Sequence, residues 1–182
     1  MSGLGIYIIL VIILVFFVIY EYNFCTRLRN KCYQSKSSID VFLTQRFDLI
    51  PNLVECVKAY SKHEEKIFIE IASLRSAYVN TGKSIRNAEK LNNKMNELIA
   101  VAENYPELKA SEQYLNLQKT LTKLESQLQA ARRIYNAEVT NYNDKVTLVP
   151  SNIVAKMFGF QEEKLFEIED YKRENINIKL EE

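Results

Sequence analysis

The sequence predicts an all-helical protein: one N-terminal transmembrane helix, then an elongated antiparallel helical bundle and a short C-terminal helix. Three observations predict this fold class. An uncharged apolar run opens the chain. Apolar residues then recur at helical spacing through most of the remaining sequence. Only four glycines and three prolines are available for turns, which favours long helices over many short elements.

Residues 4–20 form the expected transmembrane helix. No charged side chain occurs between Met1 and Tyr20. At 1.5 Å per residue the run covers about 26 Å, close to the roughly 30 Å hydrocarbon thickness of a bilayer. A cleaved secretory signal is disfavoured, because the start lacks Lys and Arg and because Tyr20 and Tyr22 stand where a small-residue cleavage site would be needed.

Basic side chains beside the span predict its orientation. All of them follow the span in the sequence: Arg27, Arg29, Lys31 and Lys36. Because Lys and Arg near a span tend to stay in the cytoplasm, we expect residues 1–3 outside the cell membrane and the chain from residue 21 onward in the cytoplasm. The same side chains could also contact anionic lipid headgroups, although a topology signal is the simpler interpretation.

The cytoplasmic bundle is expected over residues 21–160, and its first helix continues the membrane helix to about Tyr60. The apolar stripe of this helix passes Pro51 without losing phase, which predicts a kink there rather than an end. Ser61 and Glu64 form a capping-box pattern that marks the first reversal of the chain.

A second stripe runs from Ile67 to Tyr105 and keeps its phase across Gly82. This favours one long helix over two shorter ones, with a weak centre, because glycine costs a helix about 1 kcal/mol relative to alanine. The bundle then has three long helices, or four if the middle one breaks near Gly82. Pro106 marks the second reversal, since proline suits the first turn of a helix.

A third stripe extends from Tyr114 to Tyr142 and repeats every seven residues before it turns polar. A short helix from Asn152 to Phe158 follows, and Gly159 closes it. Residues 161–182 are charged and form a tail that we expect to be mobile or dependent on a partner. A short strand near the end of this tail is the alternative, but it would have no strand to pair with.

The composition narrows the class of protein. With 24 basic and 23 acidic side chains the net charge is +1, so no global field draws the domain to nucleic acid. The three cysteines, Cys25, Cys32 and Cys56, show no CxxC spacing and are interpreted as reduced, partly buried thiols. A disulfide between copies through Cys25 or Cys32 is the alternative to plain packing.

No enzyme signature is present in the sequence. Residues 82–84 read Gly-Lys-Ser but lack the earlier glycine and the preceding strand of a phosphate-binding loop. His63 is the single histidine, and the helix after it lacks the second histidine of a zinc site. We therefore predict no catalytic residues, no cofactor, no metal site and no small-molecule substrate.

One group of polar residues is expected to converge. If the first and third helices run parallel, Arg46 and Arg132 lie at the same height, and the returning helix brings Arg75 to that level. The full group is Arg46, Asp48, Asn52, Arg75, Arg132, Arg133, Tyr135 and Asn136. We expect Asp48 near Arg132 or Arg133. The group either fixes the register of the helices or forms a ligand or partner site.

Several stretches taken together resemble the LemA family of bacterial membrane-anchored helical proteins. They are residues 28–30, 38–41, 45–54, 58–60 with 63–64, 101–110, and 131–136 with 142–143. The resemblance implies a single N-terminal span, a helical cytoplasmic domain and no established enzymatic activity. The chain departs from the family at Ser37 and Ser38, where Ala-Trp is frequent, and in its longer, more charged tail.

These observations favour a membrane-tethered, non-enzymatic helical scaffold or adaptor, single-pass in the cell membrane, that presents a binding surface to cytoplasmic partners. The expected partners are the lipid bilayer and a protein partner or further copies of the chain. The alternative is a regulatory or sensor subunit of a membrane enzyme, such as an envelope-stress protease, with a ligand site at Asp48, Arg132 and Arg133.

Overall fold

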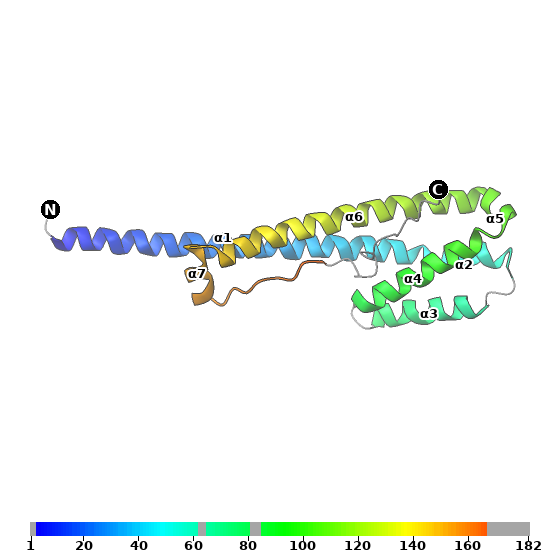
Figure 1. The fold of residues 1–182 in the computed structure, drawn as a ribbon, viewed down its shortest axis with the longest axis horizontal. Coiled ribbons are helices and arrows are strands. Elements are labelled where there is room, and N and C mark those ends of the chain that lie inside the picture. Colours follow the sequence, from blue (N-terminus) through cyan, green and yellow to red (C-terminus); the bar gives the residue numbers. More distant parts are fainter. Residues whose placement is uncertain (1–2, 62–64, 81–84, 167–182) are drawn as a thin grey trace, which may run out of the picture. The chain divides into compact units, whose positions relative to one another are not determined.

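The structure, a computed structural model, describes residues 3–61, 65–80 and 85–166. These residues form α-helices and connecting segments, with no β-strand among them (Figure 1). The helices are α1 (Gly3–Asp48), α2 (Ile50–Lys58), α3 (Glu65–Asn80), α4 (Ile85–Ala102), α5 (Pro106–Ala110), α6 (Glu112–Thr147) and α7 (Ser151–Met157). The prediction of an all-helical chain with one long apolar N-terminal helix is confirmed.

The contacts within the chain define two compact units. Unit 1 consists of residues 1–36 and 132–182, and unit 2 consists of residues 37–131. Buried side chains in unit 1 include Cys25 and Tyr142, and those in unit 2 include Leu53 and Leu91. The domain boundaries expected at residues 20 and 160 are not tested by this division and stay predictions.

Helix α1 begins with the apolar run and continues without interruption to Asp48. It is long and apolar enough to cross a membrane. Side chains along the run, from Leu4 to Tyr20, are mostly exposed, as a helix that contacts lipid on all sides requires. The apolar run and the helix that follows it are therefore one element, as the sequence predicted.

The predicted kink at Pro51 is a one-residue interruption between α1 and α2. Leu49 separates the two helices, and its N–H donates to the carbonyl of Arg46 at 3.2 Å. Pro51 lies in the first turn of α2, where its missing N–H leaves no helical hydrogen bond unmade. The apolar stripe resumes at once with Ile50 and Val57 buried.

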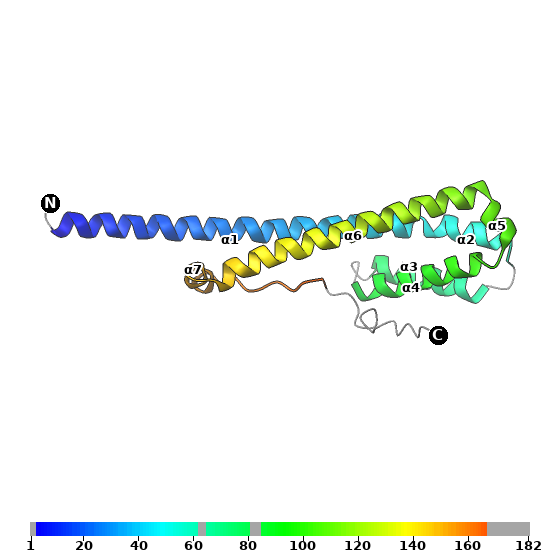
Figure 2. The ribbon, with the colours of Figure 1, turned by 45° about the horizontal axis from the view of Figure 1, so that its top comes forward.

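The preference for one continuous middle helix is wrong. Helix α3 ends at Asn80, α4 begins at Ile85, and the two pack side by side (Figures 1 and 2). Lys94 Nζ lies 2.7 Å from Glu70 Oε2, although these residues would be about 36 Å apart in one helix. A stripe that keeps its phase reports which face is buried and not whether the chain is continuous, so the four-helix alternative holds. Gly82 itself lies outside the described residues.

The second reversal and the C-terminal helix follow the prediction. Pro106 occupies the first turn of α5, and α6 begins at Glu112. Helix α7 ends at Met157, and Gly159 has a φ of +73°, a left-handed conformation that glycine adopts without strain. The first reversal cannot be compared in the same way, since the capping pattern predicted at Ser61–Glu64 falls partly outside the described residues, as does His63.

The direction of α6 corrects a second expectation. In unit 1, Lys145 Nζ lies 2.7 Å from Glu21 Oε2, while Glu138 acts electrostatically on Cys32 further along α1. Residue numbers therefore fall along α6 as they rise along α1, and the two helices are antiparallel there. The expected parallel course assumed one reversal fewer, because it was worked out for one continuous middle helix and not for the four-helix alternative.

Candidate functional site

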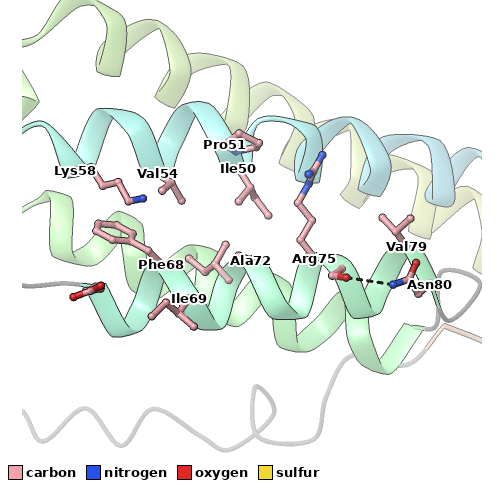
Figure 3. A pocket seen from close by; sticks show the side chains of 13 residues that line it. Ile50, Pro51, Val54, Lys58, Phe68, Ile69, Ala72, Arg75, Val79 and Asn80 are labelled. Atoms are coloured by element: carbon pink, nitrogen blue, oxygen red, sulfur yellow. Dashed lines mark hydrogen bonds between the residues drawn. The ribbon is translucent and has the colours of Figure 1, made fainter.

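A groove of about 640 Å³ lies between α2 and α3 in unit 2. Ile50 and Val54 point into it from α2, and Phe68 and Ala72 line it from α3 (Figure 3). The lining is mostly apolar, and all of the lining residues belong to α2 and α3. Grooves of this kind between two helices are common sites for ligands and for apolar segments of other proteins.

The groove arises because α2 and α3 each bury only part of their apolar surface. In α2, Leu53 and Val57 are fully buried while Val54 is half-buried between the two helices. In α3, Ile69 and Val79 are each 63% exposed although both line the groove. Apolar surface that is contiguous and open to solvent marks an interaction site more often than scattered exposed residues do.

Charged side chains border the groove. Lys58 Nζ lies 5.1 Å from the centre of the Phe68 ring, and Arg75 Nη2 lies 3.5 Å from Asp48 Oδ1. Because Arg75 and Asp48 are both substantially exposed, this ion pair is weak and exchanges easily with another partner. Glu65 is the one acidic side chain among the lining residues. The groove therefore suits an apolar segment that carries a carboxylate.

An ion pair with one buried partner lies elsewhere in unit 2. Arg46 is buried on α1, and its guanidinium donates to the Glu125 carboxylate of α6 and, at 3.3 Å, to Asn96 Oδ1 of α4. The contact ties three helices together at one level. Sequence reasoning selected Arg46 but missed its two partners. Glu125 was missed because the predicted direction of α6 was wrong, and Asn96 because α4 was predicted to continue α3.

In unit 1, two asparagines of α6 hold the segment after α7 in an extended conformation. Asn143 donates to the carbonyl of Glu163 at 2.8 Å and accepts from its N–H at 2.9 Å. Asn136 makes the same pair of bonds with Phe166, at 3.0 and 2.7 Å. Tyr135 Oη donates to the carbonyl of Lys164 at 2.9 Å. We call residues 161–166 the strap.

We call Asn136 and Asn143 together the asparagine clamp. Their spacing follows from the geometry of a helix beside an extended chain. Seven residues of a helix rise about 10.5 Å, and three residues of an extended chain span about 10 Å. Asn136 and Asn143 are therefore spaced to meet Phe166 and Glu163. The repeat Tyr135-Asn136 and Tyr142-Asn143 was the signal in the sequence. The expectation of a mobile tail is wrong for residues 161–166, and residues 167–182 lie outside the described part of the chain.

The predicted polar group falls into both units. Arg46, Asp48, Asn52 and Arg75 belong to unit 2, and Arg132, Arg133, Tyr135 and Asn136 belong to unit 1. Asp48 forms an ion pair with Arg75, and Asn52 is exposed on α2. Arg132 lies 4.7 Å from the centre of the Phe166 ring, and Arg133 is exposed. The approach of Asp48 to Arg132 or Arg133 stays a prediction, although its parallel-helix premise is wrong.

The basic residues after the span are placed in unit 1. Arg29 lies 5.0 Å from the centre of the Phe160 ring and is half-buried. Arg27, Lys31 and Lys36 are exposed, and Arg27 Nε donates to the carbonyl of Asn23 at 3.4 Å. Arg29 thus takes part in packing, while the other three point to solvent.

The described residues give no sign of reaction chemistry. Burial raises the pKa of the thiols of Cys25, Cys32 and Cys56, so these side chains are protonated and weakly nucleophilic at neutral pH. Cys25 and Cys32 are buried, Cys56 is half-buried, and all three are free thiols. Within residues 3–61, 65–80 and 85–166, no three His, Cys, Asp or Glu side chains gather as a metal site would require.

The fold defines a class: all-helical proteins with one long apolar N-terminal helix. The profile of the LemA family matches residues 35–180. The chain belongs to the LemA family, and its helix α1 is long and apolar enough to cross a membrane.

Individual relatives are distant but long in their overlap. The chain is 23% identical to magnetosome protein MamQ 1 of Paramagnetospirillum magneticum over 176 residues, which cover 81% of this chain and 65% of that protein. Its identity to MamQ of Magnetospirillum gryphiswaldense is 22%, covering 80% and 64%. Its identity to protein LemA of Metamycoplasma hominis is 23%, covering 90% and 77%. The chain thus spans slightly less than two thirds of the MamQ proteins, and none of these relatives carries the name of an enzyme.

Proposed function

We propose that this chain is a membrane-tethered, non-enzymatic adaptor whose unit 2 binds a cytoplasmic protein in the groove between α2 and α3. The observation that carries the proposal is the groove itself, with apolar side chains of α3 left open to solvent. Ile69 and Val79 are apolar and exposed to water, and covering them would stabilise a complex through burial of apolar surface.

The groove also indicates what the partner presents. Its length along α2 and α3 and its apolar floor suit an amphipathic helix that inserts one row of side chains. Lys58 and Arg75 border the same space and would pair with acidic residues at the edge of that helix. Arg75 would exchange its exposed contact with Asp48 for the partner's carboxylate.

The tether and its orientation belong to the proposal. The apolar run of α1 crosses the membrane, with residues 1–3 outside, because exposed Arg27, Lys31 and Lys36 follow the run and hold that side in the cytoplasm. Protease added to intact cells with a permeable outer layer should then leave unit 2 whole, and disruption of the membrane should expose it. Digestion before disruption would contradict the orientation.

Photocrosslinking in living cells tests the groove directly. A photoreactive phenylalanine analogue placed at Ile69 should form a discrete adduct with one partner protein, because that side chain lies in the groove and is exposed. The matched control is Leu115, which is exposed on α6 of the same unit but lies outside the groove. Adducts of the same pattern and yield from both positions would overturn the proposal.

A further inference from the structure

A second exposed apolar surface lies in unit 1. It consists of residues of α7 and of the two residues that come just before Pro150. Leu148, Val149, Ile153 and Met157 are each between 62% and 77% exposed. None of these four side chains lines the groove in unit 2, and the adaptor function proposed above does not depend on them. We call them the α7 apolar face.

Helix α7 is apolar on its exposed side as well as on its buried side. Ile153 and Met157 are four residues apart in α7 and so lie along one side of the helix, while Leu148 and Val149 lie in the segment just before it. Val154 and Ala155, on the other side, are buried in unit 1. An amphipathic helix of a soluble domain would carry polar residues where Ile153 and Met157 stand.

Contacts within unit 1 place α7 at the level where α1 leaves the apolar run. The ring of Tyr22 lies 4.9 Å from that of Phe158 and 5.7 Å from that of Phe160, centre to centre. Tyr22 follows the last residue of the run, Tyr20, by two positions, or about 3 Å along the helix. Both views show α7 beside this part of α1 (Figures 1 and 2).

The end of the apolar run places this level close to the bilayer boundary. The run from Leu4 to Tyr20 covers about 26 Å, a few ångströms less than the roughly 30 Å of hydrocarbon. Tyr20 and Tyr22 have the amphipathic rings that settle at the boundary between lipid and water. Exposed Lys156, on α7 itself, can extend its ammonium to the headgroups while its methylenes stay beside the apolar side chains.

From this arrangement we propose that the α7 apolar face inserts into the headgroup and upper acyl region of the bilayer that α1 crosses. The occupant is lipid because Phe158, next to α7, contacts α1 at Tyr22, two residues after the exposed apolar run that lipid covers as well. Four side chains are also a small surface compared with the roughly 800 Å² that each partner buries in a stable protein interface. The protein then touches its membrane twice, through the span and through α7.

Tryptophan fluorescence can test this contact in the full-length protein, because the chain has no tryptophan of its own. The reporters are Ile153→Trp and, as a second position on the same face, Met157→Trp. The matched control is Ile134→Trp, an exposed apolar position of α6 in the same unit, 11 residues from Lys145. Each variant is reconstituted in vesicles whose phospholipids carry bromine near the headgroup end of one acyl chain, and circular dichroism checks its helicity.

Bromine quenches an indole only at close range, so the expected result is several-fold stronger quenching for Ile153→Trp and Met157→Trp than for Ile134→Trp. Their emission should also shift to shorter wavelength than that of the control. Quenching of both reporters no stronger than the control, in proteins of full helicity, would overturn the proposal. Blue-shifted emission without quenching would overturn it too, since the face would then be covered by protein.

Discussion

Arg46 shows how one buried charge can organise unit 2. Its side chain is 7% exposed, so its guanidinium depends on protein acceptors, and Glu125 and Asn96 supply them from two other helices. Glu125 is 37% exposed and could be hydrated without its partner. The two halves of the pair are therefore unequal: removing the acid strands a buried cation, whereas removing the cation returns an acid to water.

This inequality gives a prediction for thermal unfolding. Glu125→Ala should destabilise the protein by about 2 kcal/mol, which lowers Tm by roughly 4 to 8 °C in a chain of this size. Arg46→Met, which fills the space with an apolar chain, should cost distinctly less. Lys123→Ala, exposed on the same helix, is the control. Melting curves followed by circular dichroism give the three values, and equal losses for the first two variants would show that Arg46 is not desolvated.

The asparagine clamp predicts local protection of the strap. Asn143→Ala removes both bonds to Glu163, each worth about 1 kcal/mol, so the Glu163 amide should exchange with solvent roughly ten times faster or more. Asn141→Ala changes an exposed asparagine on the same helix and should leave the strap unchanged. Hydrogen exchange read by mass spectrometry compares them. Unaltered exchange in Asn143→Ala would mean that packing of Phe160 and Phe166 holds the strap alone.

Helices differ in how far their sequence determines them. The continuous course of α1, the interruption at Pro51, the reversal at Pro106 and the end of α7 at Gly159 follow from residues whose local preference is strong. The break between α3 and α4 follows from packing: two antiparallel helices and one long helix bury the same stripe. Local periodicity does not distinguish them, and that ambiguity also reversed the predicted direction of α6.

The same limit applies to the candidate sites. Arg46, Arg75 and Asn136 could be selected from sequence as polar residues among apolar stripes, but their partners depend on how many times the chain turns back. The groove between α2 and α3 could not be predicted, because Ile69 and Val79 continue an ordinary helical pattern and only their exposure identifies them. The strap was missed since its charged composition resembles that of a solvated tail.

Chemical crosslinking can test the α3–α4 hairpin at the scale of elements. A carbodiimide joins an amine to a carboxylate only in direct contact, so it should link Lys94 to Glu70, which lie 2.7 Å apart. Their mutual hydrogen bond lowers the pKa of Glu70 and raises that of Lys94, which favours the ion pair at neutral pH. Glu70→Gln should abolish this product and leave the link from Lys94 to Glu97 on the same helix. Peptide mapping that finds only the Glu97 product in the wild type would contradict the hairpin.

At the scale of the whole molecule, we propose that membrane attachment and partner binding are separable. Unit 1 contains the apolar run, the basic residues after it and the α7 apolar face, to which we assign contact with the bilayer. Unit 2 contains the groove, to which we assign binding of a protein. A substitution in the groove should therefore abolish binding of the protein partner without releasing the chain from the membrane.

Native mass spectrometry of the protein extracted with its surrounding lipid tests that central claim most directly. The wild type and Leu115→Glu should each be recovered from the membrane with one protein partner in fixed stoichiometry. Ile69→Glu, which places a charge on an exposed groove position without disturbing the core, should remain in the membrane and lose the partner. The same partner and stoichiometry in all three preparations, or recovery of the chain alone from the wild type, would contradict the account.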